Sequence, residues 1–337
     1  MPTIAVGPQD LHVYLEQNPG FGKNSHDHLH YIDWGEESRN VHTIFDSDPR
    51  ERGTLRRLIR NGQLSYHCNS ITPNSIDPDT NSWIHSWSEY DLVLAWQTPT
   101  ESTGVPEKLY HSQNRLLKPH RTAVVDQLWR QDRFSRGTVS YTQERTPDFT
   151  PDAEIPTGEF EWQHHVLGWL HSTKGYTEQL VTWENNAPPP LEYWRNAAIN
   201  IITETEWEYV NLTEKTYSNM LWAKPFVVMG AAGVLNHVET LGYENYSDVM
   251  DLSFDAEQRL KHRAKGLVRS VLSHQSPQEL HRAAQPTALR NQQRVIRATA
   301  NLVFPSILED DTVTWIGYAE RVKNNCYLAR QQARTML

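Results

Sequence analysis

Long apolar runs and cysteines are scarce in this sequence of 337 residues. No run approaches the roughly 18 consecutive apolar residues of a membrane-spanning helix. Residues 1–10 contain neither the basic nor the apolar segment of a secretory signal, so we expect no membrane association. The two cysteines, Cys68 and Cys326, match no metal-binding spacing. We therefore expect reduced thiols and a cytoplasmic protein.

Common catalytic signatures are missing as well. The sequence has no Gly-x-Ser-x-Gly, no P-loop and no zinc-deaminase motif, so hydrolase, NTPase and deaminase functions lose support. Hydrophobic residues make up 38% of the chain and aromatic residues 10%, which is enough for a packed core. The length is typical of two domains or of one large domain.

Acidic residues outnumber basic ones, and the two are unevenly distributed. The formal net charge is −9, and residues 138–255 hold 18 acidic and five basic side chains. Residues 105–137 hold seven basic and three acidic side chains, and residues 256–337 hold 13 basic and six acidic ones. This distribution is compatible with an anionic ligand bound to part of the surface. The alternative is that the arginines and lysines only solvate helix faces.

Strands and helices alternate along the middle of the chain. In the first 105 residues, strand-like runs at Thr3–Val6, Val41–Phe45 and Asp91–Trp96 indicate an α/β domain. Beyond Lys118 the pattern predicts, in order, helix His120–Arg130, strand Gly137–Thr142, helix Leu191–Asn200, strand Ile201–Thr205, helix Leu212–Lys224, strand Pro225–Met229 and helix Val234–Leu241. Strands separated by helices of this length predict a mostly parallel sheet. From Ala256 onward the pattern predicts two or three helices.

The segment Asn211–Tyr217 carries the strongest chemical signal. A helix that begins at residues 211–213 presents free backbone N–H groups and the positive end of its dipole, as a diphosphate site requires. Lys215 in the first turn adds a full positive charge, and Glu214 beside it can accept both hydroxyls of a ribose. The alternative is a capping box, in which Glu214 reaches back to the N–H of Asn211.

A glycine-containing turn follows the predicted strand Pro225–Met229. Ligands bind at the carboxyl ends of strands in open parallel sheets, and Gly230 and Gly233 would let a base or sugar approach the backbone closely. Ordinary turn glycines are the alternative explanation for both residues.

Two sets of motifs follow one another between residues 110 and 260. The first is Ser-Gln-Asn-Arg-Leu-Leu-Lys-Pro-His-Arg, ending at Arg121, followed by Val-Ser-Tyr. The second is Thr-Glu-Lys-Thr at residues 213–216, followed by Lys-Pro-Phe-Val-Val-Met-Gly, Gly-Val-Leu and Leu-Gly-Tyr-Glu-Asn-Tyr. Together they resemble the donor-binding half of GT-B glycosyltransferase-like proteins of phages and bacteria, which are distantly similar to the GDP-fucose-dependent α-1,3-fucosyltransferases.

The resemblance implies a GT-B-like α/β fold, with two Rossmann-like domains facing each other across a cleft and with C-terminal helices. We assign residues 1–105 to an acceptor-side domain, residues 106–305 to a nucleotide-sugar-binding domain and residues 306–337 to a C-terminal helical segment. The N-terminal half contains no motif that aligns with the fucosyltransferases, so neither the sugar nor the acceptor carries over.

The resemblance also implies roles for individual residues. Glu214 and Lys215 would contact the ribose and phosphates of the donor, with Thr213 and Thr216 as flanking hydroxyl donors. The full predicted donor site comprises Arg115, Arg121, Glu204, Thr213, Glu214, Lys215, Thr216, Gly230 and Gly233. The two arginines suit bidentate phosphate binding, or else are surface charge. Glu204 would hold sugar hydroxyls, or else is one of three exposed acids with Glu206 and Glu208.

An inverting transfer needs a general base, usually a carboxylate or a histidine of the N-terminal domain. The candidates are Asp27, His28, Asp46 and Glu89, and we predict Asp27 as the catalytic residue. Alternate histidines of the run His26–His30 would face one side of a strand, as in a metal site, but no further cluster completes such a site. We therefore predict no metal and no cofactor other than the nucleotide-sugar substrate.

These features predict a metal-independent glycosyltransferase that uses a UDP- or GDP-linked sugar. Relatives that carry these motifs without an anchor look phage-like, which would place the protein in the host cytoplasm. A hydroxymethylated pyrimidine in DNA is then one acceptor, with the basic segments on its phosphates, and a glycan or protein hydroxyl is another. The alternative is a non-catalytic virion or assembly protein that keeps the sheet without the chemistry.

Overall fold

The computed structural model describes residues 3–33, 49–68, 75–77, 82–86, 90–96, 104–114, 118–141, 191–205, 207–302 and 306–337. The chain divides into two compact units. Unit 1 comprises residues 1–94 together with 297–337, and unit 2 comprises residues 95–296. No helix within the described ranges is long and apolar enough to cross a membrane.

Unit 1 is built on a six-stranded sheet with the order β10-β1-β2-β3-β5-β4. Its strands are β1 (Thr3–Val6), β2 (His28–Asp33), β3 (Leu64–Cys68), β4 (Ser75–Asp77), β5 (Ser82–Ser86) and β10 (Val313–Ile316). All neighbours pair in parallel except β4 and β5, which are antiparallel. The strand predicted at Thr3–Val6 is therefore confirmed, and the one predicted at Val41–Phe45 lies outside the described residues.

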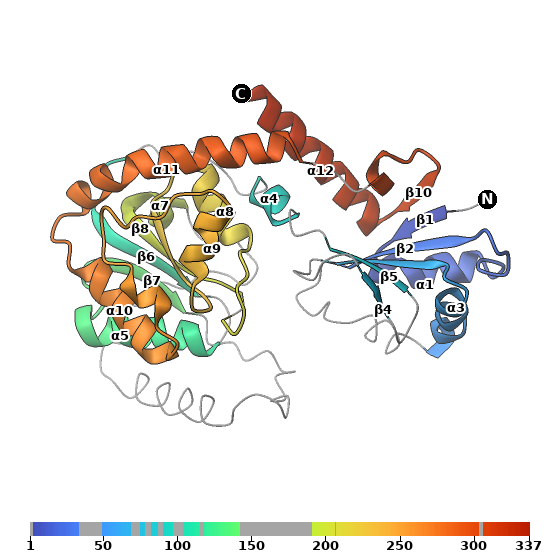
Figure 1. Ribbon diagram of the computed structural model, residues 1–337, viewed down its shortest axis with the longest axis horizontal. Helices are drawn as coiled ribbons and strands as arrows, with labels where there is room; N and C mark the ends of the chain where they lie inside the picture. Colours follow the sequence, from blue (N-terminus) through green and yellow to red (C-terminus); the bar gives the residue numbers. More distant parts are fainter. Residues whose placement is uncertain are drawn as a thin grey trace. The chain divides into compact units, whose positions relative to one another are not determined.

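Helices α1 (Pro8–Gln17), α3 (Pro49–Arg60) and α12 (Tyr318–Thr335) pack on this sheet (Figure 1). The chain also forms a 3-10 turn at Ser306–Glu309 and the short helix α4 (Tyr90–Ala95), which lies where the two units divide. Because side chains alternate along strands, Leu29 and Tyr31 of β2 lie on one face, where they form a core with Leu55 and Leu58 of α3. The strand predicted at Asp91–Trp96 is wrong, since this short apolar run forms α4.

The end of the chain belongs to unit 1. Strand β10 pairs with β1 through the register Thr3↔Val313 to Val6↔Ile316, and α12 packs on both strands. The prediction of a separate helical segment at residues 306–337 is wrong here, because the sequence Val-Thr-Trp-Ile is rich in β-branched and aromatic residues and extends the sheet. Cys326 of α12 is a free thiol in this packing, and burial raises its pKa to about 12.

Unit 2 contains a four-stranded, fully parallel sheet with the order β7-β6-β8-β9. The strands are β6 (Lys108–Asn114), β7 (Gly137–Tyr141), β8 (Ala197–Thr203) and β9 (Phe226–Met229). The helices are α5 (Pro119–Asp132), α7 (Leu191–Asn196), α8 (Glu214–Leu221), α9 (Val234–Thr240), a 3-10 turn at Ser253–Ala256, α10 (Leu260–Leu272) and α11 (Pro277–Ala300). The prediction of a mixed α/β chain with mostly parallel sheets is confirmed in both units.

Helices α5 and α10 pack against each other on this sheet (Figure 1). Just beyond α5, Arg136 bonds Asp132 and donates to the carbonyl oxygens of Leu272 and His274 at the end of α10, at 3.1 and 3.0 Å. Asp132 also accepts a hydrogen bond of 2.7 Å from the buried Tyr110 hydroxyl of β6. This network holds the carboxyl ends of α5 and α10 together and ties the end of α5 to strand β6.

Replacing Gly137 with alanine should destabilise unit 2 by about 1–3 kcal/mol, the usual range for overpacking a core. A Cβ atom at Gly137 would lie 2.1 Å from the ring of Tyr110, which is fully buried and held by Asp132. Urea unfolding of the full chain measures the change. The control is Gly104→Ala, because a Cβ there meets nothing within 4 Å. Equal midpoints for the two variants would contradict the packing argument.

Candidate functional site

The carboxyl ends of β6 and β8 form the switch point of the unit 2 sheet. Strand β6 is followed in the chain by its neighbour β7 on one side, whereas β8 and β9 lie on the other. Connections therefore leave β6 and β8 toward opposite faces, which opens a crevice outside their carboxyl ends. The helices that follow, α5 and α8, both begin at this edge. Ligands of open parallel sheets bind at such a point.

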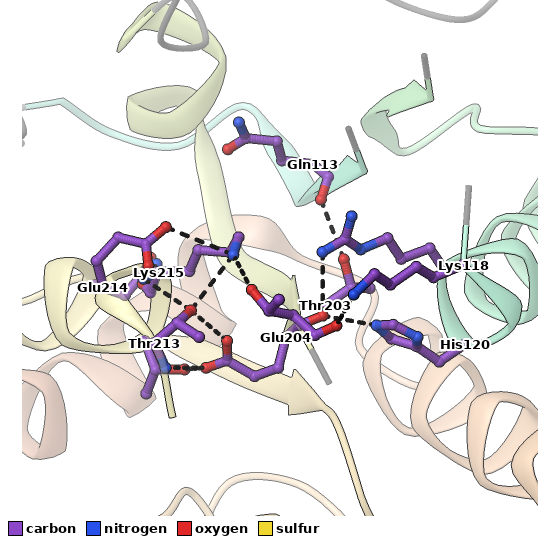
Figure 2. Close-up of polar contacts among 12 residues, drawn as sticks. Gln113, Lys118, His120, Thr203, Glu204, Thr213, Glu214 and Lys215 are labelled. Atoms are coloured by element: carbon purple, nitrogen blue, oxygen red, sulfur yellow. Dashed lines mark hydrogen bonds and ion pairs between the residues drawn. The ribbon is translucent and has the colours of Figure 1, made fainter. Parts of the chain in front are cut away.

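Two lysines at this edge of the sheet, Lys118 and Lys215, both hydrogen-bond Thr205; Figure 2 labels the two lysines. Lys118, the residue before α5, donates from Nζ to the Thr205 carbonyl oxygen at 2.6 Å. Lys215 of α8 donates from Nζ to the Thr205 hydroxyl at 2.9 Å. Lys215 Nζ also lies 3.4 Å from the Thr213 hydroxyl and 3.5 Å from the Glu214 carboxylate. Two lysine ammonium groups thus lie at this edge of the sheet, one just before α5 and one in α8, and both lysines are only partly buried.

Glu204 anchors the N-terminus of α8 (Figure 2). Its side chain is fully buried, and its carboxylate accepts from the backbone N–H of Thr213 at 3.2 Å and from the Thr213 hydroxyl at 2.5 Å. The Thr216 hydroxyl donates to the same carboxylate. Glu204 is therefore not an exposed acid, and its carboxylate is held by protein donors; contact with sugar hydroxyls stays a prediction.

The alternative interpretation, a capping box at Asn211 and Glu214, is wrong. Helix α8 begins at Glu214, and Thr213 is its N-cap residue, whose hydroxyl accepts from the N–H of Lys215. Glu214 is instead the first helical residue, with a partly exposed carboxylate 3.5 Å from Lys215 Nζ. Glu214 thus pairs with Lys215 at the start of α8, and its contact with a ribose stays a prediction.

His120 and Arg121 hold the backbone of the same corner. His120 Nε2 lies 2.7 Å from the Glu204 carbonyl oxygen, and because a carbonyl can only accept, Nε2 carries the proton. Burial, with the positive charge of Arg121 next, holds the pKa of His120 well below its usual range, so this imidazole is neutral. Arg121 donates to the same oxygen at 3.2 Å. Arg121 is buried, which excludes the surface-charge interpretation.

The two predicted glycines lie after β9. Gly230 adjoins the site, since a Cβ there would lie 3.7 Å from Glu204 Cβ. Gly233 has φ +83°, a left-handed conformation that favours glycine, and caps α9. The Asp255 carboxylate accepts from the N–H groups of Leu235 and Asn236 at 3.1 and 3.3 Å, so protein side chains already satisfy that helix N-terminus. For Gly233 the turn alone explains the residue type.

Asp27, the predicted base, lies in unit 1 immediately before β2, at the amino end of its parallel strands. Its carboxylate is 2% exposed and accepts from the N–H groups of Gly22 and Asn24 at 2.8 and 3.4 Å. This geometry indicates a loop-stabilising role at the amino edge of the sheet, and a role of Asp27 as the catalytic base stays a prediction. Asp46 and Glu89 lie outside the described residues.

The histidines of β2 face one side, as their alternation predicts. The rings of His28 and His30 have centroids 4.7 Å apart, His28 bonds Ser65, and His30 Nδ1 lies 2.9 Å from His67 Nε2. Within the described ranges, no group of three or more His, Cys, Asp or Glu side chains is arranged to hold a metal ion.

The structure thus brings six of the predicted donor-site residues into one network: Arg121, Glu204, Thr213, Glu214, Lys215 and Thr216. Arg115 lies outside the described residues. Sequence reasoning missed the site roles of Lys118, His120 and Thr205, although the first two belong to the first motif. The positions of Lys118 and His120 in the sequence could have indicated a site role, because the two residues flank Pro119, and proline is common at the first position of a helix.

No family model and no curated protein sequence matches this chain. Three solved structures resemble it. A UDP-forming α,α-trehalose-phosphate synthase from Burkholderia xenovorans is 10% identical with a TM-score of 0.42, over 98% of this chain and 74% of that one. An OtsA protein in its apo form is 12% identical with a TM-score of 0.37, over 90% and 73%. A trehalose-6-phosphate protein from E. coli, bound with UDP-2-fluoro glucose, is 13% identical with a TM-score of 0.36, over 89% and 73%. Likenesses at this level assign no activity to the chain.

Proposed function

We propose that the protein is a nucleotide-sugar-dependent glycosyltransferase of the GT-B type. The observation that carries the proposal is the convergence of Lys118 and Lys215 on Thr205 at the switch point of a parallel sheet. Two ammonium groups beside the N-terminus of α8 suit a nucleoside diphosphate, whose charge they would balance. The sequence resemblance supports the same ligand. UDP- and GDP-linked sugars are the donors proposed.

In the proposed reaction, the positive charges of Lys118 and Lys215 stabilise the diphosphate leaving group. The acceptor oxygen forms a bond to the anomeric carbon while the bond from that carbon to the diphosphate oxygen breaks, and the acceptor proton passes to a base. The electron pair leaves with the diphosphate, where Lys118 and Lys215 would stabilise it without a divalent metal. Glu214, partly exposed beside Lys215, would accept the ribose hydroxyls. Glu204 would act indirectly, because it fixes the start of α8.

Titration calorimetry with UDP, GDP and their sugar conjugates tests the donor site. We expect Lys118→Ala and Lys215→Ala each to weaken binding about 10–100-fold, the cost of one charge-assisted contact. Lys265→Ala is the matched control. Lys265 is exposed on α10, so this substitution removes the same positive charge away from the crevice. Absence of binding by the wild-type protein, or equal affinities for all variants, would refute the proposal.

The acceptor is tested separately. The protein is incubated with a sugar-nucleotide panel and with hydroxymethylated DNA, a glycan or a peptide, with and without EDTA, and products are analysed by mass spectrometry. A hexose or pentose mass increment on one acceptor identifies it. Transfer that survives EDTA supports lysine stabilisation of the diphosphate, whereas loss of transfer would argue for a metal. Donor binding without transfer to any acceptor would favour a binding protein over an enzyme.

A further inference from the structure

Helix α8, which carries Glu214 and Lys215 of the donor site, is eight residues long. Isolated helices shorter than about 12–15 residues are marginal in water, so contacts with the rest of unit 2 must hold α8 in place. The hydrogen bonds of Glu204 reach Thr213 and Thr216 at the start of this helix. A separate set of polar contacts reaches its second turn.

Asn219, in the second turn of α8, joins this helix to the sheet and to α7. Its amide nitrogen Nδ2 donates to the carbonyl oxygen of Lys215 at 2.8 Å. Its Oδ1 accepts from Asn200 Nδ2 of β8 at 2.6 Å and from Trp194 Nε1 of α7 at 3.2 Å. Both asparagines are buried. One side-chain amide thus links β8 and α7 to the backbone of the donor-site lysine.

Trp194 sets the orientation of this amide. An indole Nε1 can only donate, so the atom of Asn219 that faces it is the oxygen. A flipped amide would bring two donors together at Trp194 and two oxygens together at Lys215. Asparagine also has low helix propensity, because its side chain competes for backbone groups. Its place inside such a short helix is therefore explained by the bonds that its side chain makes.

We propose that Asn219 is a positioning residue of the donor site. It acts through Lys215, whose carbonyl oxygen it holds and whose Nζ lies 2.9 Å from the Thr205 hydroxyl. Together with Glu204, it ties α8 to β8 at both turns of the helix. Binding groups must usually be held within about 0.5 Å of their productive geometry, so a loosened α8 would weaken the contacts of Lys215 with a donor.

This inference rests on the proposed function, because it concerns how the donor site is held. Calorimetric titration of UDP and GDP into Asn219→Ala tests it. We expect binding about 3–30-fold weaker than that of the wild type, the range of coupling within one hydrogen-bond network. Trp194→Phe keeps an aromatic ring without the N–H donor and should weaken binding by a smaller factor. In the Asn219→Ala background it should add less than about twofold, since both substitutions act through one amide.

Tyr110→Phe is the matched control for lost stability. It also removes one buried hydrogen bond of unit 2, the 2.7 Å bond to Asp132, at the opposite end of α5 from the crevice. Its affinity for the nucleotides should stay within about twofold of the wild-type value, as for independent sites. Equal weakening by Tyr110→Phe and Asn219→Ala would show that general loss of stability lowers the affinity, and would overturn the positioning role.

Hydrogen exchange without nucleotide separates this role from the proposed function. The backbone N–H groups of Thr216 and Tyr217, which bond the Thr213 carbonyl oxygen, should exchange faster in Asn219→Ala but not in Tyr110→Phe. Wild-type protein that binds neither UDP nor GDP would refute the donor site, and the positioning role with it. Wild-type binding with unchanged affinity or unchanged exchange in Asn219→Ala would refute the positioning role alone.

Discussion

Replacing Glu204 with alanine is expected to lower the free energy of unfolding of unit 2 by about 3–5 kcal/mol. The substitution leaves the Thr213 N–H, the Thr213 hydroxyl and the Thr216 hydroxyl without their acceptor in a buried corner. Each buried donor without a partner costs about 1–3 kcal/mol, and hydroxyl rotation recovers part of the sum. Removal of the carboxylate also takes a negative charge from the positive end of the α8 dipole.

Urea unfolding with hydrogen exchange at β8 and α8 measures this loss. Glu204→Gln should cost less, because the amide oxygen still accepts from one or two of the three donors. Glu208→Ala removes an exposed carboxylate from the same loop and should change stability by less than about 0.5 kcal/mol. An alanine variant at Glu204 that unfolds like the one at Glu208 would show that the carboxylate does not hold the helix.

The role of Glu204 illustrates what the sequence could reveal about the site. The motif Thr-Glu-Lys-Thr points to α8, and its lysine lies at the crevice as expected. The partner of both threonines, however, is nine and 12 residues upstream, on the far side of a loop. Lys118 contacts Thr205 across 87 residues of chain. Such pairs follow from the order of strands in the sheet, which local patterns do not encode.

Local sequence patterns also failed to predict β6, an inner strand of the unit 2 sheet. Helix α5 and strands β7 and β9 follow clear apolar periodicity and lie within two residues of their predicted bounds. Strand β6 was missed, because His111, Ser112 and Asn114 are polar although each is at most 2% exposed. A buried strand usually appears as an apolar run, whereas here hydrogen bonds with neighbouring groups satisfy the polar side chains of Ser112 and Asn114.

Lys224 presents the opposite case, a motif residue that lies away from the site. Its side chain is 1% exposed at the amino end of β9, and Nζ donates to the carbonyl oxygens of Arg195, at 3.1 Å, and Ala197. Burial lowers the pKa of Lys224 to about 7. Burial lowers the pKa of His111 to about 4 and also lowers the pKa of His281, and the positive charge of Lys224 lowers both further. Both imidazoles therefore stay neutral above pH 7. The amine is therefore the group among these three that titrates between pH 7 and 10.

The stability of unit 2 is consequently expected to rise with pH relative to a Lys224→Met variant. Between the folded pKa of about 7 and the unfolded value of 10.5, the unfolded chain binds one proton more at this residue. Stability therefore rises by up to about 1.4 kcal/mol per pH unit, and the limit over the whole window is about 5 kcal/mol. Below pH 7 both states are protonated, so the difference between the two proteins is constant there.

The two carbonyl acceptors and the Trp194 ring, 5.8 Å from Nζ, favour the ammonium form and keep the measured slope below that limit. Urea unfolding of both proteins at pH 7, 8, 9 and 10 gives the slope, and tyrosine or cysteine titration cancels in the difference. Lys265→Met, an exposed lysine, should show no such trend. A pH-independent difference for Lys224→Met would mean that the buried amine keeps its proton up to pH 10, held by the Arg195 and Ala197 carbonyls.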